Sequence, residues 1–190
     1  MFTADWKKEI FTIPNLLSLF RLLLIPVYMG IYLQAEDMAD YALAAGILAV
    51  SCATDAIDGK IARRFGMISN LGKVLDPIAD KATQFSLIIV LSIRRPVLWI
   101  LVGMFVVKES FQLIAGAVML RKGKMLSGAL MAGKVCTTVL FVSLILMVLL
   151  PDMSKTVVNI LCAVDALFML ISFVSYARVY FLKSPKIQDL

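Results

Sequence analysis

Long apolar stretches separated by short polar links recur along the whole chain. Six of them hold about 20 or more mostly apolar residues each: 11–33, 41–63, 70–93, 96–120, 126–150 and 156–182. A helix needs about 20 such residues to cross the hydrocarbon core of a bilayer. The pattern predicts an all-α polytopic membrane protein whose six transmembrane helices form one bundle.

Composition agrees with this prediction. Of the 190 residues, 61% are hydrophobic and 17% are charged, which is far more apolar than a soluble domain requires. Because the six stretches fill nearly the whole chain, we expect a single membrane domain over residues 1–190. The segment before the first stretch combines apolar Phe2, Trp6 and Ile10 with basic Lys7 and Lys8. This arrangement predicts a short N-terminal helix over residues 2–10 that lies in the membrane interface.

Basic residues are divided unevenly between the two sides of the predicted bundle. One side carries Arg94, Arg95 and Lys155, and the other carries ten: Lys7, Lys8, Lys60, Arg63, Arg64, Arg121, Lys122, Lys124, Lys183 and Lys186. Since basic loops are retained in the cytoplasm, we expect an integral protein of the cytoplasmic membrane with both termini in the cytoplasm. The net charge of +6 is split among short loops, so it predicts contact with anionic lipid headgroups and no nucleic-acid partner.

Four aspartates lie in the second and third apolar stretches. Asp55 and Asp58 are three residues apart, and Asp76 and Asp80 are four residues apart. Residues at these spacings share a helix face, and the cytoplasmic link folds one face toward the other. Converging carboxylates repel one another unless cations neutralise them, and such oxygen ligands suit Mg²⁺, Mn²⁺ or Ca²⁺. A divalent-metal site explains them better than four solvated interfacial charges, because ionisable residues inside a membrane are usually functional.

Small residues and one arginine accompany the aspartates. Gly59, Ala62 and Gly72 let helices approach closely or leave room for a bulky ligand, although alone they would indicate only packing. Arg63 offers a planar fork for phosphate oxygens. Its alternative role is that of an anchor at the cytoplasmic interface.

Together these residues resemble the signature of the CDP-alcohol phosphatidyltransferases. The pattern D(x)2DG(x)2AR(x)8G(x)3D(x)3D is matched at every fixed position between Asp55 and Asp80. The six helices and the segment IPNLLSLFR also resemble that family. The resemblance implies transfer of a phosphatidyl group from CDP-diacylglycerol to an alcohol with release of CMP, and it implies a homodimer.

The resemblance also implies a role for each motif position. The ligands of Mg²⁺ or Mn²⁺, with two ions expected, would be Asp55, Asp58, Asp76 and Asp80. Asp80 would in addition be the catalytic base that takes the proton of the acceptor hydroxyl. The residues lying against CDP-diacylglycerol would be Gly59, Ala62, Arg63 and Gly72. General chemistry agrees, since divalent ions polarise a diphosphate and a carboxylate can serve as base, while the chain contains no histidine.

Cations on the remaining helices indicate which kind of alcohol is the acceptor. Lys134, Lys108 and Arg178 could converge on an anionic alcohol such as glycerol 3-phosphate. The segments LGKVLDPIADK and IPNLLSLFRLLLIP most resemble bacterial phosphatidylglycerophosphate synthases. The segment VVKESFQLIAG departs from them, with a lysine where an arginine is expected before the glutamate. A cardiolipin synthase of the same superfamily, which uses phosphatidylglycerol, is therefore the alternative.

Other roles stay open for some of these charges. Lys108 could be paired with Glu109 inside the bundle, and Arg178 could extend to the cytoplasmic interface. For Asp165, on the sixth stretch, we expect a structural role. A divalent-cation transporter could also use intramembrane aspartates, but it would need carboxylates reachable from both sides and would not need Gly59 or Ala62.

Overall fold

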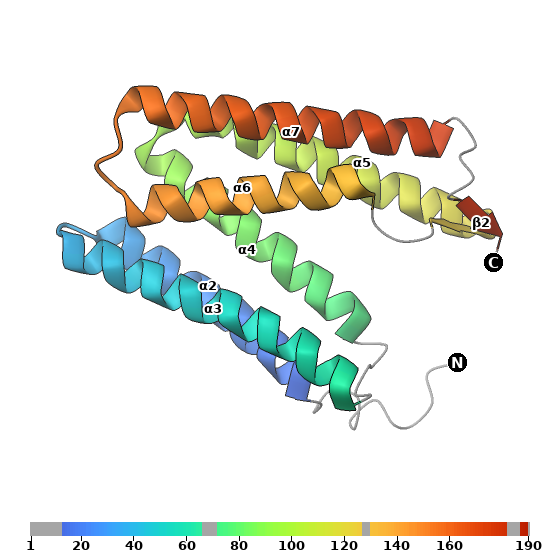
Figure 1. Cartoon of the computed structure of the whole chain (residues 1–190), viewed down its shortest axis with the longest axis horizontal. Helices are drawn as coiled ribbons and strands as arrows, with labels where there is room; N and C mark the ends of the chain where they lie inside the picture. Colours follow the sequence, from blue (N-terminus) through green and yellow to red (C-terminus); the bar gives the residue numbers. More distant parts are fainter. Residues whose placement is uncertain (1–12, 66–71, 127–129, 182–186, 190) are drawn as a thin grey trace. The chain divides into compact units, whose positions relative to one another are not determined.

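The computed structural model describes residues 13–65, 72–126, 130–181 and 187–189 (Figure 1). Within these ranges only the backbone is described for residues 13, 14, 55–65, 73, 74, 124–126 and 187–189. The predicted interfacial helix over residues 2–10 lies outside the described residues.

Within the described residues, each of the six predicted apolar stretches contains a helix. In chain order the helices are α2 (Ile13–Gln34), α3 (Met38–Phe65), α4 (Gly72–Arg94), α5 (Trp99–Arg121), α6 (Met131–Leu149) and α7 (Lys155–Phe181), with a 3-10 turn η1 (Pro96–Leu98) before α5. The predicted bounds agree within a few residues except at the start of the fifth stretch. There Gly123 adopts a φ of 69°, a left-handed conformation that glycine takes readily and that ends α5. Residues Lys124–Leu126 then form strand β1, which pairs antiparallel with β2 (Ile187–Asp189).

Four of the helical segments are long and apolar enough to span a membrane. They are Asn15–Gln34, Pro96–Arg121, Met131–Leu149 and Lys155–Phe181. In the sequence of α3 the motif follows directly after Thr54, and α4 begins with the charged segment GKVLDPIADK. The described chain is thus that of an integral membrane protein, and its two less apolar helices are those that carry the aspartates.

The chain divides into two compact units, Met1–Val90 and Leu91–Leu190. In the first unit, α2 and α3 lie side by side (Figure 1), and Tyr32 meets Tyr41 edge to face with ring centroids 5.4 Å apart. α2 also contacts α4, because the hydroxyl of buried Tyr28 forms hydrogen bonds with the Ser86 hydroxyl and the Thr83 carbonyl.

In the second unit, α7 packs against both α5 and α6. Phe111 of α5 lies 4.9 Å, centroid to centroid, from Phe173 of α7. The interior of this unit is mainly apolar, with side chains such as Leu144, Met147 and Met169 almost fully buried, and it also contains buried Lys108 and Asp165.

Candidate functional site

The two aspartates of α4 lie near its first turns. α4 begins at Gly72, which is buried, and Asp76 and Asp80 follow one turn apart. Pro77 lies inside this helix, where it has no N–H to donate to the carbonyl of Lys73. Both carboxylates thus project from a continuous helix, one turn apart on the same face.

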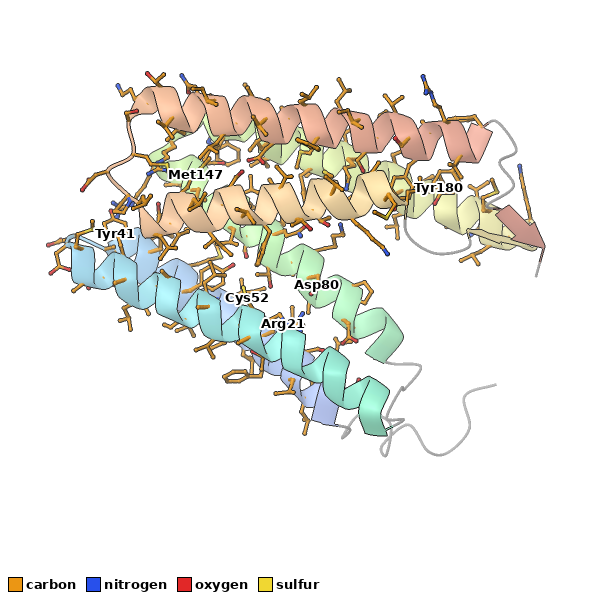
Figure 2. The ribbon with its side chains drawn as sticks, in the orientation of Figure 1. Arg21, Tyr41, Cys52, Asp80, Met147 and Tyr180 are labelled. Atoms are coloured by element: carbon orange, nitrogen blue, oxygen red, sulfur yellow. The ribbon has the colours of Figure 1, made fainter. Side chains whose placement is uncertain are left out.

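Polar side chains of α2 hold these two carboxylates. The Ser18 hydroxyl donates to Oδ1 of Asp76 at 2.5 Å, and Nη1 of Arg21 donates to Oδ1 of Asp80 at 2.5 Å; Figure 2 shows the Arg21–Asp80 pair. Ser18 and Arg21 are three residues apart on one face of α2, and both are buried, at 0% and 2% exposure. One polar face of α2 therefore contacts both aspartates of α4.

The Arg21–Asp80 ion pair is asymmetric in its environment. The Arg21 side chain is 2% exposed and that of Asp80 is 48% exposed. A buried guanidinium requires a charged partner, because its desolvation is otherwise uncompensated. Asp80 supplies that partner while much of its carboxylate surface remains accessible to a ligand.

The aspartate motif alone did not identify Ser18 or Arg21 as the partners of Asp76 and Asp80. A signal was present in the segment IPNLLSLFR. There Asn15, Ser18 and Arg21 interrupt an apolar helix at intervals of three residues, and all three are buried. Polar residues on one face of a membrane helix indicate a polar partner helix.

The other two aspartates lie on α3. That helix continues unbroken through Asp55, Asp58 and Arg63 to Phe65, so the predicted helical spacing of the first motif half is confirmed. The side chains of residues 55–65, including those of Gly59 and Ala62, lie outside the described ones. Among the side chains that are described, no three potential metal ligands come together. The meeting of all four aspartates stays a prediction.

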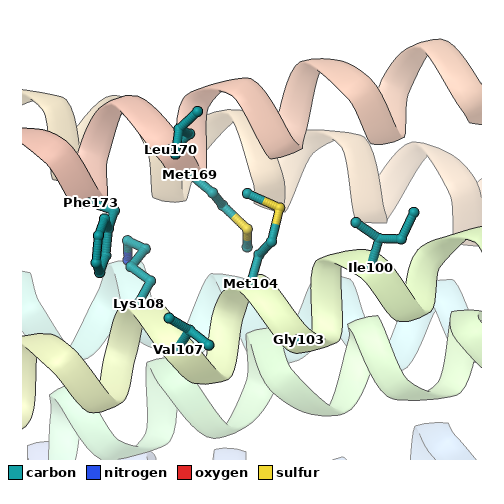
Figure 3. Close-up of a pocket in the computed structure, with 8 residues that line it drawn as sticks. All are labelled: Ile100, Gly103, Met104, Val107, Lys108, Met169, Leu170 and Phe173. Atoms are coloured by element: carbon teal, nitrogen blue, oxygen red, sulfur yellow. The ribbon is translucent and has the colours of Figure 1, made fainter.

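Lys108 is not presented to a polar site. It is 4% exposed, and its Nζ donates to Oε1 of Glu109 at 2.5 Å. Beside it lies an apolar cavity of about 430 Å³ between α5 and α7, lined in part by Met104, Met169 and Phe173 (Figure 3). The contact corresponds to the alternative of a Lys108–Glu109 pair satisfied within the bundle.

The remaining acceptor candidates are accessible. Lys134 is exposed near the start of α6, and Arg178 is exposed in the last turn of α7. Asp165, in contrast, is 1% exposed on α7, and its structural role stays a prediction.

Comparison with known proteins gives the class. The family model of CDP-alcohol phosphatidyltransferases matches residues 11–178, a span that runs from the beginning of α2 nearly to the end of α7. The chain belongs to the CDP-alcohol phosphatidyltransferase family.

Relatives within this family carry two kinds of name. The chain is 32% identical over 171 residues to a CDP-diacylglycerol–glycerol-3-phosphate 3-phosphatidyltransferase of Aquifex aeolicus, with 86% of this chain and 93% of that protein covered. It is 33% identical over 126 residues to a CMP-forming cardiolipin synthase of Streptomyces coelicolor, with 64% of this chain and 57% of that protein covered. It is 31% identical over 119 residues to a probable phosphatidylglycerophosphate synthase of Mycobacterium tuberculosis, with 62% and 57% covered. The chain thus spans little more than half the length of the latter two.

Proposed function

We propose that the protein transfers the phosphatidyl group of CDP-diacylglycerol to glycerol 3-phosphate, yielding phosphatidylglycerophosphate and CMP. The observation that carries this proposal is the complete motif from Asp55 to Asp80 in a chain of this family, with two of its carboxylates fixed on α4 by α2. The Aquifex relative, aligned over most of both chains, is named for this activity.

The motif carboxylates fit a divalent metal. Asp76 is half-buried and Asp80 is 48% exposed, and both offer the hard oxygen donors that Mg²⁺ and Mn²⁺ prefer. In the proposal Asp76 and Asp80 hold two ions together with Asp55 and Asp58 of α3. Bound there, the ions would neutralise the diphosphate and stabilise the departing phosphate.

The chain's own residues then divide the reaction between them. Asp80 accepts the proton of the acceptor hydroxyl, and the resulting oxygen forms a bond to the phosphorus of the phosphatidyl group. The bond from that phosphorus to the bridging oxygen breaks, and CMP leaves with that oxygen. Arg63 binds phosphate oxygens, while Gly59, Ala62 and Gly72 leave space for the CDP moiety.

The acceptor is proposed to bind through Lys134 and Arg178, which are exposed cations, while Lys108 already has Glu109 as its partner. Phosphatidylglycerol is the alternative acceptor, because the Streptomyces relative is named a cardiolipin synthase. Both reactions would use the same donor and the same motif.

The proposed setting is the cytoplasmic membrane, with a homodimer whose termini and active site face the cytoplasm. The basic links of the sequence support this orientation. A protease-sensitive tag at the C-terminus should be cleaved in inverted vesicles and protected in right-side-out ones. The mass of the native protein in detergent tests the dimer, and a monomer that is fully active would contradict it.

The deciding experiment supplies purified protein with CDP-diacylglycerol and one acceptor at a time: glycerol 3-phosphate, phosphatidylglycerol, serine or inositol. CMP release and the mass of the product lipid are measured with Mg²⁺, with Mn²⁺ and with excess chelator. We expect phosphatidylglycerophosphate, formed only when metal is present. Cardiolipin as the product would establish the alternative, and full turnover in chelator would refute the metal site. Mg²⁺ uptake into vesicles without CMP release would indicate a transporter instead.

A further inference from the structure

Two links of the second unit meet at one end of its helices. Nη2 of Arg95, just before η1, donates to the carbonyl of Leu150 at 3.3 Å and to that of Pro151 at 2.8 Å. These bonds join the start of α5 to the link between α6 and α7. Next to them lies a cavity of about 250 Å³.

The cavity is lined by cations. Its lining includes Arg94, Arg95, Lys155 and Asn159, and the last two are one turn apart on α7. No acidic side chain lines it; Asp152, in the neighbouring link, is exposed. A group of three positive charges around one cavity, with an amide beside them, favours an anionic ligand.

Arg95 is set up to add a donor to such a ligand. Its Nη2 is engaged by the two carbonyls, whereas its Nη1 is buried and has no hydrogen-bond partner among the residues that the structure describes. A buried guanidinium nitrogen without an acceptor is unfavourable. The N-terminus of α7, at Lys155, adds a positive dipole end.

This end of the molecule differs from the motif end. At about 1.5 Å per residue, Arg94 lies about 21 Å along the axis of α4 from Asp80. Arg94, Arg95 and Lys155 are also the three basic residues on the side predicted to face away from the cytoplasm, where basic residues are disfavoured. Orientation does not account for them, whereas binding of an anion at the membrane surface does.

We propose that this cavity binds the phosphate of an anionic phospholipid from the leaflet facing away from the cytoplasm. The phosphate of a phospholipid lies at headgroup depth, level with the end of a membrane helix, and an anionic headgroup adds the net negative charge that three cations attract. The inference does not depend on the acceptor or on the reaction proposed above.

Lys155 is the residue to vary, because it is exposed at the start of α7 and no described hydrogen bond or ion pair ties it to the fold. Arg95 is less suitable, since its bonds to Leu150 and Pro151 also hold the links together. The matched control is Lys122→Gln, which removes an exposed lysine just after α5, at the opposite end of that helix.

The experiment measures lipid retention on the purified protein by native mass spectrometry, with phosphatidylserine as the probe and phosphatidylcholine as the neutral comparison. Phosphatidylserine is neither a substrate nor a product of the proposed reaction. We expect Lys155→Gln to bind phosphatidylserine about 3- to 10-fold more weakly than wild type, and Lys155→Glu to bind it more weakly still. Lys122→Gln should match wild type, and phosphatidylcholine should not discriminate among the variants.

Three results would overturn the proposal. The first is equal phosphatidylserine binding by wild type and both Lys155 variants. The second is a loss of the same size for Lys122→Gln. The third is displacement of the lipid by excess inorganic phosphate with the same dependence on Lys155, which would identify free phosphate as the ligand. The unfolding midpoint of each variant in detergent, if unchanged, excludes misfolding as the cause.

Discussion

At the scale of single residues, the pairing of α2 with α4 determines how the motif carboxylates are presented. Ser18 and Arg21 are completely or nearly buried, so their positions are fixed by packing, whereas Asp80 remains about half exposed. A carboxylate oriented from its buried side and open on the other is suited to a reaction at a membrane interface, where orientation of the reacting groups contributes much of the rate.

Replacing Asp80 separates binding from chemistry. In Asp80→Asn the amide oxygen can still accept the hydrogen bond from Arg21, but it cannot take a proton. We expect CDP-diacylglycerol to bind with little change while turnover falls by about 10²- to 10⁴-fold. Asp55→Asn and Asp58→Asn should instead weaken nucleotide and metal binding. Exposed Asp152→Asn is the control, and near-normal turnover by Asp80→Asn would remove Asp80 from the role of base.

Ser18→Ala tests the support of Asp76. The substitution removes the hydroxyl that donates to Oδ1 of Asp76, and a lost hydrogen bond to a charged group lowers the free energy of unfolding by about 1–3 kcal/mol. Denaturation in mixed detergent micelles measures this change. Ser175→Ala is the matched control, because that hydroxyl bonds only to the Ile171 carbonyl in its own helix and its loss should change stability by a few tenths of a kcal/mol. Equal effects of the two variants would contradict the assignment.

At the scale of elements, the helices were predictable because each needs about 20 apolar residues, and that length requirement is visible in the sequence. The contacts between the helices were harder to predict than the helices themselves. Helical spacing placed Asp76 and Asp80 on one face of α4 and predicted that this face turns toward the aspartates of α3, but it did not predict the contacts with Ser18 and Arg21 of α2. The sequence allowed Lys108 either to bind the acceptor or to pair with Glu109, and only the structure showed its contact with Glu109. The start of α6 was predicted too early, because the turn at Gly123 and strand β1 depend on pairing with distant residues Ile187–Asp189.

The close approach of α6 to α7 depends on Gly133. A Cβ at this position would lie 2.8 Å from the hydroxyl oxygen of Tyr176 and 2.9 Å from its Cε2. Tyr176 is 8% exposed, and its hydroxyl accepts a hydrogen bond from the Leu130 N–H at 3.4 Å, next to the first turn of α6. The ring therefore has little room to move.

Gly133→Ala should lower the free energy of unfolding by about 1–3 kcal/mol, as overpacking of a tight interface does. Gly46→Ala is the control, since no atom lies within 4 Å of a Cβ built there and alanine favours a helix by about 1 kcal/mol over glycine. Thermal unfolding of both variants in detergent makes the comparison. A Gly133→Ala protein as stable as Gly46→Ala would show that α6 and α7 can separate at this point without loss.

At the scale of the whole molecule, charge distinguishes the two ends of the helices along the chain. The C-terminal ends of α3 and α5 carry lysines and arginines beside the motif and before β1, whereas Arg94, Arg95 and Lys155 lie at the end of α4, just after it and at the start of α7. The first group fits retention in the cytoplasm, where a water-soluble acceptor and the released CMP are available. The proposed acceptor cations belong to helices other than those of the motif, so the choice of acceptor can change while the donor site is kept.

That separation makes the acceptor testable through a single charge. Lys134 is exposed on α6, and its backbone carbonyl, rather than its side chain, receives the Thr137 and Thr138 hydroxyls, so its neutralisation should leave the helix intact. If Lys134 binds the phosphate of glycerol 3-phosphate, Lys134→Gln should raise the KM for that substrate and leave the KM for CDP-diacylglycerol nearly unchanged. A charge-assisted hydrogen bond of about 1.5–3 kcal/mol corresponds to a loss of roughly 10- to 150-fold in kcat/KM.

Lys122→Gln provides the control for loss of a lysine at the same end of the second unit. A loss shared equally by both substrates would assign Lys134 to folding. A wild-type protein that consumes phosphatidylglycerol but not glycerol 3-phosphate would establish the cardiolipin synthase reaction, and Lys134 would then not bind glycerol 3-phosphate.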